Sequence, residues 1–368
     1  MEKVIVGIVG NGNISPIYLK NLTTVFNRIV TVKGVCDLIP ERSKKAAESW
    51  DIPVIYDTMY DMFKDDEIEI VLNLTTPKQH HGVAIEALKH NKNTHSEKPM
   101  SVSLDDAKEL FDIGKEKGLL VGVAPDTFMG AGIQTCRKLL DDGYIGSPIG
   151  AAAYMTGHGH ETWHPDPEFY YEQGGGPMLD MGPYYVTALI NLLGPVKRLT
   201  GTSHSMFETR TITSEPKYGK VIPVSVDTHV NGIMEFENGA VGSIVMSFDM
   251  WKSEHPNIEI FGTEGTMQVP DPNGFGGPVR IQRKDGDFYE MPLTHQYNEN
   301  CRGVAVADMA MALRTGREHR ANSELAYHVL DIMLGFGKSS RTGKHYELQT
   351  SCCRPQPMPM NVIPGDLD

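Results

Sequence analysis

Short strand-like segments alternate with amphipathic segments through the first third of this 368-residue chain. Helical spacing of apolar residues separates the strands, for example between Pro40 and Trp50. Alternation of this kind is typical of parallel strands joined by crossover helices, and the nearly continuous apolar run of residues 68–74 fits a central strand that is covered on both faces. The predicted strands are 3–9, 29–36, 54–56, 68–74, 93–96 and 119–123. We therefore predict an α/β protein whose residues 1–125 form a Rossmann-type, doubly wound parallel sheet.

A different pattern begins near residue 126. Residues 232–236 and 240–248 flank an Asn238-Gly239 turn, which predicts a β-hairpin. Further hairpins are predicted where residues 258–261 and 266–269 flank a glycine-containing turn, and at Asp285-Gly286, and helices at 305–313 and 324–336. Long, mostly antiparallel strands with a few helices predict a second, α+β domain over residues 126–345. The proline-rich residues 346–368 lack periodicity and are expected to form an extended or disordered arm.

The first predicted strand runs into a glycine-rich turn, Gly10-Asn11-Gly12-Asn13-Ile14. Gly10 permits a tight strand-to-helix turn, and Gly12 lets the backbone approach a pyrophosphate. Ser15 followed by Pro16 is a helix-start signal, so the positive end of a helix would face the phosphates.

The same glycine-rich turn could be an ordinary strand–turn–helix or a dinucleotide site, and an acidic residue favours the dinucleotide site. Asp37 ends the second predicted strand, near the spacing at which a carboxylate binds the adenosine ribose hydroxyls. The same carboxylate repels a 2′-phosphate, and the sequence therefore predicts NAD rather than NADP as the cofactor.

The composition of the chain indicates which classes of binding partner to expect. The net charge of −13 disfavours a nucleic-acid or anionic-membrane surface, and no apolar run approaches the length of a membrane span. The N-terminus lacks a signal-peptide pattern, and the five scattered cysteines are typical of a reducing compartment. We expect a cytoplasmic protein with no nucleic-acid and no membrane partner.

Glu97-Lys98-Pro99 directly follows a strand predicted to end at the carboxyl edge of the sheet, where ligands bind in open α/β folds. The proline biases Lys98 toward an extended backbone. A lysine near a nicotinamide and a carboxylate can exchange a proton with a substrate hydroxyl. A solvated loop lysine is the alternative interpretation.

Several motifs together resemble the glucose–fructose oxidoreductase / inositol dehydrogenase (Gfo/Idh/MocA) family. The matching segments are GIVGNGNIS at 7–15, the strand end at Asp37, TTPKQHHGVAIEAL at 75–88, EKP at 97–99, DDGYIGSP at 141–148 and GGGPMLDMGPYY at 174–185. The resemblance implies a C-terminal domain with a large open sheet, redox chemistry at a sugar or polyol carbon with NAD(P), and a homodimer or homotetramer.

The resemblance also implies roles for individual residues. Thr75, Pro77 and His81 would line the nicotinamide side of the cofactor, with Glu97 beside them. Lys98 would be the catalytic lysine, and the carboxylate of Asp180 would bind the substrate hydroxyls.

One position departs from the family pattern, which has a histidine four residues after the aspartate as proton acceptor. This chain has Tyr184 there, and a continuous helix over 180–193 would place Asp180 and Tyr184 on one face. A phenol ordinarily has a pKa near 10, so Tyr184 is a base only if its pKa is lowered. We hypothesise that Lys98 and Tyr184 share the proton transfer; the alternative is that Tyr184 only packs and Lys98 acts alone.

Residues 158–176 are rich in histidine and aromatic residues. His158, His160 and His164, together with Glu161 and Asp166, permit a metal site, but nothing in the family pattern requires one and we predict none. We expect instead that the three histidines and Trp163 form the wall of a sugar site, with Phe169 or Tyr170 as further cover. His160 or His164 is also a candidate to replace the missing family histidine.

Two other groups have less certain roles. Asp126, after the last Rossmann strand, either reaches the same cleft or caps a helix. We interpret Arg137, Arg302, Arg314 and Arg317 as surface or interdomain charges.

The sequence thus predicts an NAD-dependent dehydrogenase acting on a secondary hydroxyl of a sugar, glycoside or cyclitol. Two alternatives remain. In the first, tightly bound NAD supports hydride exchange between sugars or oxidation-assisted glycoside cleavage. In the second, the protein is a non-catalytic, NAD-binding regulator of a sugar pathway.

Overall fold

Six parallel strands form the N-terminal sheet, in the order β3-β2-β1-β4-β5-β6. A computed structural model describes residues 2–284 and 286–368. The strands are β1 (Val4–Val9), β2 (Val30–Cys36), β3 (Val54–Ile55), β4 (Ile70–Asn73), β5 (Asn93–Ser96) and β6 (Val121–Val123). The helices are α1 (Ser15–Thr24), α2 (Pro40–Trp50), α3 (Met59–Phe63), α4 (His80–Lys89) and α5 (Leu104–Lys117). The predicted doubly wound sheet is confirmed.

The central strands of this sheet are buried on both faces, because helices cover both sides. All four residues of β4 are buried, as are the residues of β1 except Ile5. The strands run in one direction, and their carboxyl ends therefore meet at one edge. Gly10, Asp37, Thr75, Lys98 and Asp126 all follow strand ends and are brought to this edge.

The second sheet has nine strands in the order β16-β15-β14-β13-β7-β12-β11-β8-β17. Only β7 and β12 pair in parallel; the other neighbours are antiparallel. Its strands are β7 (Pro148–Thr156), β8 (Val196–His204), β11 (His229–Phe236), β12 (Val241–Ser247), β13 (Ile258–Gly262), β14 (Gly265–Val269), β15 (Val279–Arg283), β16 (Tyr289–Met291) and β17 (Tyr346–Glu347). A separate ribbon pairs β9 (Thr209–Thr211) with β10 (Val221–Pro223). The predicted large, mostly antiparallel sheet is confirmed.

The predicted hairpins are present in this sheet. β11 pairs with β12, β13 with β14 and β15 with β16. Asp285, which we placed at the tip of the last hairpin, lies outside the described residues.

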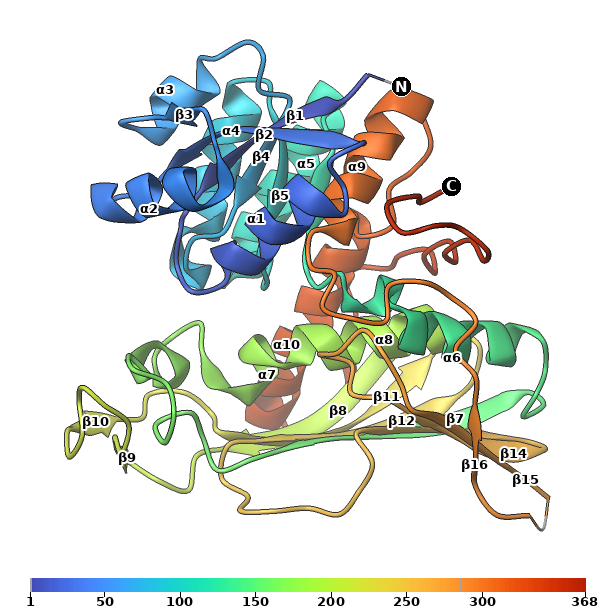
Figure 1. The fold of residues 1–368 in the computed structure, drawn as a ribbon. Coiled ribbons are helices and arrows are strands. Elements are labelled where there is room, and N and C mark those ends of the chain that lie inside the picture. The colour runs from blue at the N-terminus through green and yellow to red at the C-terminus, as the bar shows by residue number, and fades with distance from the viewer. Residues whose placement is uncertain (1, 285) are drawn as a thin grey trace.

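Helices lie between the two sheets (Figure 1). They are α6 (Ala131–Asp141), α7 (Gly176–Asp180), α8 (Gly182–Leu193), α9 (Val304–Thr315) and α10 (Ser323–Thr342). Figure 1 shows α6, α7 and α8 above the large sheet, α9 beside the Rossmann layer and α10 running between the two layers. Within the described residues, helices cover only one face of the large sheet (Figure 1).

Two facing glycines seat α10 on the large sheet. Gly201 of β8 is paired with Gly232 of β11, and the ring of Phe336 fills the space above them. A Cβ on Gly201 would lie 2.7 Å from Cδ1 of this ring, and a Cβ on Gly232 would also collide with it. The Phe336 ring is fully buried. It is therefore the wedge, in the sense of a side chain packed between α10 and the two glycines of the large sheet.

Residues 351–368 form no helix or strand and run along the chain's own surface. Met358 N–H donates to Gln134 Oε1 over 2.8 Å, and Tyr297 donates its hydroxyl to the carbonyl of Asp366 over 2.5 Å. Arg28 of the Rossmann domain forms an ion pair with Asp366. The arm therefore joins the two domains of one chain.

In the search of the described residues, no helix had both the length and the apolar character needed to span a membrane.

We expect Phe336→Ala to destabilise the protein by about 3–5 kcal/mol, because the lost ring leaves a cavity above two glycines. Denaturant unfolding measures this change. Ile55→Ala, at a half-exposed position of β3, is the matched control and should cost less than about 1 kcal/mol. Equal losses from the two variants would show that the wedge is not a specific contact.

Candidate active site

The turn after β1 has the shape that the sequence predicts. Gly10 has φ of +95°, and a Cβ there would lie 2.8 Å from the carbonyl carbon of Leu74, so only glycine fits. A Cβ on Gly12, by contrast, would have no neighbour within 4 Å. The backbone at Gly12 is thus open to a ligand at the N-terminus of α1.

The start of α1 differs slightly from the prediction. Ile14 rather than Ser15 is the N-cap residue, and the helix has no side-chain cap. The Ser15 hydroxyl donates to the Gly12 carbonyl over 2.9 Å instead. No side chain caps the helix, so the positive end of α1 faces the open turn at Gly12, as a phosphate site needs.

Asp37 lies beside this turn. Its carboxylate accepts the backbone N–H groups of Asn11 (2.6 Å) and Ile39 (2.8 Å). Oδ1 of Asn11 is buried and has no hydrogen-bond partner among the residues that the structure describes. The open turn, the fixed carboxylate and the orphaned amide oxygen fit an adenine dinucleotide with a free ribose 2′-hydroxyl.

The loop after β4 lies at the next position along the edge. Thr75 donates its hydroxyl to Asn73 Oδ1 over 2.7 Å, and Pro77 begins a 3-10 turn, residues 77–79. His81 does not face Lys98: its ring bonds Glu109 of α5 over 2.8 Å. α4 thus turns this side chain toward α5, and the place of His81 beside the nicotinamide stays a prediction.

His80, which the sequence analysis did not single out, occupies the inner position. Its ring is fully buried, and Nδ1 lies 2.7 Å from the carbonyl oxygen of Pro99. Nε2 lies 3.1 Å from the carbonyl oxygen of Thr75. Burial lowers the pKa of His80. The neutral ring ties the Thr75 loop to the backbone at Lys98-Pro99; the adjacent pair of histidines in the motif was the available signal.

The carboxylate of Asp180 is the centre of the site. Lys98 Nζ donates to Asp180 Oδ1 over 2.9 Å and to the Asp180 carbonyl over 2.7 Å. His160 Nε2 lies 3.0 Å from the other carboxylate oxygen, Oδ2. The three side chains are only 15–18% exposed. One carboxylate therefore positions both an ammonium and an imidazole.

The charges of this cluster stabilise one another. Burial by itself would raise the pKa of Asp180, but Lys98 and His160 outweigh burial and lower the pKa to about 2. Burial likewise disfavours the Lys98 ammonium, yet the Asp180 charge outweighs it and raises the lysine pKa. Both groups are consequently ionised at neutral pH.

The continuous helix over residues 180–193 that would place Asp180 and Tyr184 on one face is not present. α7 ends at Asp180, and α8 begins at Gly182. Pro183 has no N–H to continue the helix, and Tyr184 N–H bonds the carbonyl of Met181 rather than that of Asp180. The break frees the Asp180 carbonyl to accept the second hydrogen bond from Lys98.

Tyr184 lies beside Lys98, whose Nζ is 5.2 Å from the ring centroid. Burial raises the pKa of Tyr184, and the nearby charges of Lys98 and Arg302 offset only part of that increase. The lowered pKa that our hypothesis for a tyrosine base requires is therefore not found. Arg302, which we interpreted as a surface or interdomain charge, lies against this phenol.

Both carboxylate oxygens of Glu97 accept hydrogen bonds. Oε1 accepts the Tyr18 hydroxyl over 2.7 Å, and Oε2 accepts the Lys98 backbone N–H over 3.0 Å. Glu97 therefore fixes the backbone of Lys98 against α1.

Asp126 does not line the cleft. It is fully buried, and Oδ2 accepts the N–H of Gly303 over 2.7 Å at the start of α9. Burial raises its pKa to about 6. The capping alternative therefore applies, although the helix is distant in sequence, and the expectation of substrate contact is wrong.

The histidine-rich loop divides into distinct positions. Only His160 reaches Asp180, and its ring packs between Tyr170, Phe248 and Trp163. His164 packs on the other edges of Trp163 and Tyr170, and burial lowers its pKa. Among the described residues, no group of three or more histidine, cysteine, aspartate or glutamate side chains is placed to bind a metal.

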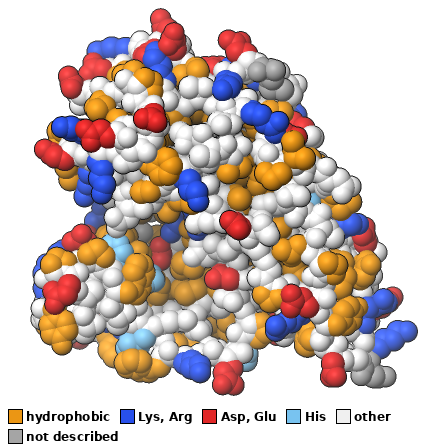
Figure 2. All heavy atoms as spheres, viewed as in Figure 1, with side chains coloured by type: hydrophobic (Ala, Val, Ile, Leu, Met, Phe, Trp, Pro, Cys, Tyr) orange, Lys and Arg blue, Asp and Glu red, His pale blue; other side chains and the backbone are white. Residues whose placement is uncertain are grey.

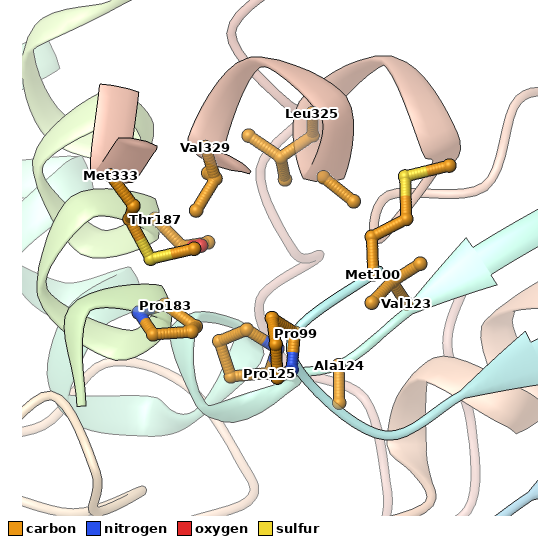
Figure 3. A pocket seen from close by; sticks show the side chains of 11 residues that line it. Pro99, Met100, Val123, Ala124, Pro125, Pro183, Thr187, Leu325, Val329 and Met333 are labelled. Carbon is orange, nitrogen blue, oxygen red and sulfur yellow. The ribbon is translucent and has the colours of Figure 1, made fainter. Parts of the chain in front are cut away.

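Histidine and hydrophobic side chains border a hollow between the two layers, seen at the left of the molecule in Figure 2. On the opposite side of the Lys98 backbone, a small gap lies between Pro99, α8 and α10 (Figure 3). Thr187 is the only polar residue among those lining this gap. The gap is therefore almost wholly apolar, unlike the polar cluster around Asp180.

Comparison with known proteins identifies the class. Residues 4–124 match the model of the oxidoreductase family with an NAD-binding Rossmann fold, and residues 133–268 match the GFO/IDH/MocA C-terminal domain. The chain belongs to the GFO/IDH/MocA family of oxidoreductases, and its cofactor is NAD.

Two relatives illustrate the range of the family. The scyllo-inositol 2-dehydrogenase (NAD(+)) of Bacillus subtilis is 26% identical over 265 residues, covering 71% of this chain and 72% of that protein. The trans-1,2-dihydrobenzene-1,2-diol dehydrogenase of Bos taurus is 25% identical over 287 residues, covering 78% and 79%.

Solved structures share the fold. Levoglucosan dehydrogenase in complex with NADH has a TM-score of 0.82 at 19% identity, covering 95% of this chain and 100% of that one. The aldose-aldose oxidoreductase of Caulobacter crescentus has a TM-score of 0.77, also at 19% identity, covering 94% and 100%.

We expect Asp37→Ala to weaken NAD binding about 10- to 100-fold, because the variant loses charge-assisted hydrogen bonds to the ribose. Titration of NADH fluorescence measures this loss. Binding of NADPH should weaken less or improve, since the repulsion of a 2′-phosphate is removed. Glu48→Gln, at an exposed position of α2, is the control and should leave both affinities unchanged; an equal loss for both cofactors would contradict the ribose assignment.

The lowered pKa of Asp180 also predicts an acid-dependent stability. A carboxyl whose pKa is near 2 in the folded state and near 3.9 in the unfolded state stabilises the fold above pH 4. This contribution is lost as the pH falls from about 4 to 2. We expect Asp180→Asn to flatten that part of the pH dependence of the free energy of unfolding, measured in urea. An unchanged slope would contradict the ion pair.

Proposed function

We propose that this protein is an NAD-dependent dehydrogenase that oxidises a secondary hydroxyl of a sugar, glycoside or cyclitol, reversibly. The bound nicotinamide supplies the hydride acceptor. The observation that carries the proposal is the Asp180 carboxylate, bonded to both Lys98 and His160 at the carboxyl edge of the Rossmann sheet.

His160 is the proton acceptor in this proposal. Its Nε2 is bonded to the ionised carboxylate of Asp180 and therefore carries the proton, which leaves Nδ1 free to accept one. A carboxylate that fixes the tautomer and orientation of an imidazole is a recurrent device in general base catalysis. A histidine of the loop before α7 thus takes the role of base that the family pattern gives to the residue at position 184.

Lys98 stabilises negative charge in this proposal. Its raised pKa keeps it an ammonium, which makes it a poor base but a strong hydrogen-bond donor to the substrate oxygen. As the hydroxyl loses its proton, the oxygen gains negative charge beside a cation that is already in place. The aspartate orients both partners and undergoes no protonation itself.

Tyr184 and Trp163 shape the substrate site. The protonated phenol of Tyr184 lies beside Lys98 and is available as a hydrogen-bond donor. Trp163, edge-on to His160 with ring centroids 5.3 Å apart, offers an indole to the apolar face of a sugar ring. The names of relatives such as D-xylose dehydrogenase and inositol dehydrogenase support a polyhydroxylated substrate.

Two further properties belong to the proposal. Exposed apolar residues lie on neighbouring strands of the large sheet, at Ile149, Ile233 and Val241. We propose that a second copy of the chain covers this face in a homodimer or homotetramer. A cytoplasmic location is the remaining proposal.

We expect His160→Ala and Lys98→Met each to lower kcat about 10²- to 10⁴-fold, because each removes a group that acts on the transferred proton or the developing charge. The assay follows NADH absorbance over a panel of sugars, glycosides and inositols. Tyr184→Phe should cost less than about tenfold, since a phenol with a raised pKa is not the base. His345→Gln, at an exposed position, is the control for loss of an imidazole.

Two results would contradict this assignment. If Tyr184→Phe lost as much kcat as His160→Ala while still binding NADH, the tyrosine would be the base. If no substrate of the panel reduced NAD, the protein would not be a dehydrogenase of this class, and the regulator alternative would be favoured.

A further inference from the structure

We propose that a second sugar ring, linked to the sugar that is oxidised, binds on the exposed indole of Trp251. The substrate class is then an extended glycoside such as a disaccharide. This inference rests on the proposed function, because it places the second ring next to the site assigned to the reacting ring.

Trp251 is exposed and yet fixed in orientation. Its side chain is 82% exposed, but one face of the indole is stacked on the ring of His158, with centroids 3.5 Å apart and planes at 13°. Phe207 packs edge-on against the His158 ring, with ring centroids 6.0 Å apart and planes at 90°. Single exposed apolar residues are ordinary on protein surfaces; a stacked aromatic group that presents a free face is a preformed platform.

A buried ionic network supports this platform. The guanidinium of Arg210 lies 4.5 Å from the Phe207 ring centroid, and its side chain is only 4% exposed. It forms ion pairs with Glu161, from the histidine-rich loop, and with Asp249, two residues before Trp251. Because the charges are paired and removed from water, the network fixes the three segments that meet under the indole.

The platform is continuous with the catalytic centre. His158 and His160 belong to one loop, and two residues of chain span at most about 7 Å. Trp163, three residues after His160, is 61% exposed and contacts the His160 ring. Trp163 thus lies beside the histidine assigned to the reacting ring, and Trp251 lies on the histidine two residues earlier in the chain.

The chemistry around Trp251 suits a sugar better than a purely apolar ligand. Lys252 and Glu254, both exposed, lie one and three residues after the tryptophan in the chain. An exposed aromatic face with charged residues close by in the chain suits a pyranose, which has an apolar C–H face and a rim of hydroxyls. Phe207, which packs against His158 and is 41% exposed, adds apolar surface beside the indole.

The first test compares single sugars with disaccharides in Trp251→Ala. The probes are methyl β-D-glucoside and D-xylose on one side, and cellobiose and maltose on the other. We expect kcat/KM for the oxidised disaccharide to fall about three- to tenfold, the size of an aromatic stacking contact, and that for the single sugar to stay within twofold. Trp50→Phe, at the end of α2 in the other domain, is the matched control and should change neither.

The second test requires no turnover. The chain has three tryptophans, so Trp50→Phe combined with Trp163→Phe leaves Trp251 as the sole emitter. We expect disaccharides to change its emission in the presence of NADH and single sugars to leave it unchanged. If no sugar is oxidised, the proposed function fails, and this titration still decides the subsite.

Three results would overturn the inference. The first is an equal effect of Trp251→Ala on single sugars and disaccharides, and the second is no effect on either together with an unresponsive emission. The third is a response to phenyl β-D-glucoside alone, which would show that the platform takes an aromatic aglycone and not a sugar.

Discussion

A buried carboxylate between two cationic or titratable partners is the constraint on which this site depends. Asp180 contributes both carboxylate oxygens and its backbone carbonyl to Lys98 and His160. Removing a carboxylate and an ammonium from water is costly unless each is paired and hydrogen-bonded. The pairing therefore requires that the Lys98 loop, the end of α7 and the histidine-rich loop meet within hydrogen-bonding distance. The Rossmann edge, the helix layer and the loop are thus positioned by one another.

Backbone contacts hold these three segments in position. The break between α7 and α8 leaves the Asp180 carbonyl without a helical partner, and Lys98 provides one. On the other side, Glu97 binds the Lys98 N–H, and His80 lies against the Pro99 carbonyl. A flexible four-carbon lysine side chain is thereby restrained at both its backbone and its ammonium. Such preorganisation places a fixed positive charge where an alkoxide would form, with no rearrangement at the moment of reaction.

Sequence patterns predicted the parallel sheet, the hairpins and the cofactor turn because each depends on local rules. A Gly-x-Gly turn requires positive φ at Gly10, and an Asn-Gly pair closes a hairpin between β11 and β12. Local rules left undecided what depends on contacts between distant segments. His81 bonds Glu109 of α5, Asp126 takes the capping role, and Arg302 lies against Tyr184.

The sequence by itself determined the fold class, the NAD site and the chemical types available: a lysine, an aspartate and a set of histidines. Tertiary structure decided which of those histidines serves the site. His158, His160 and His164 are equivalent by composition, and only packing of the loop against Tyr170 and Phe248 brings one of them to Asp180. The physical reason is one of scale. A hydrogen bond requires its two heavy atoms to lie within about 3 Å of each other. Spacing along a loop does not determine side-chain positions to that precision.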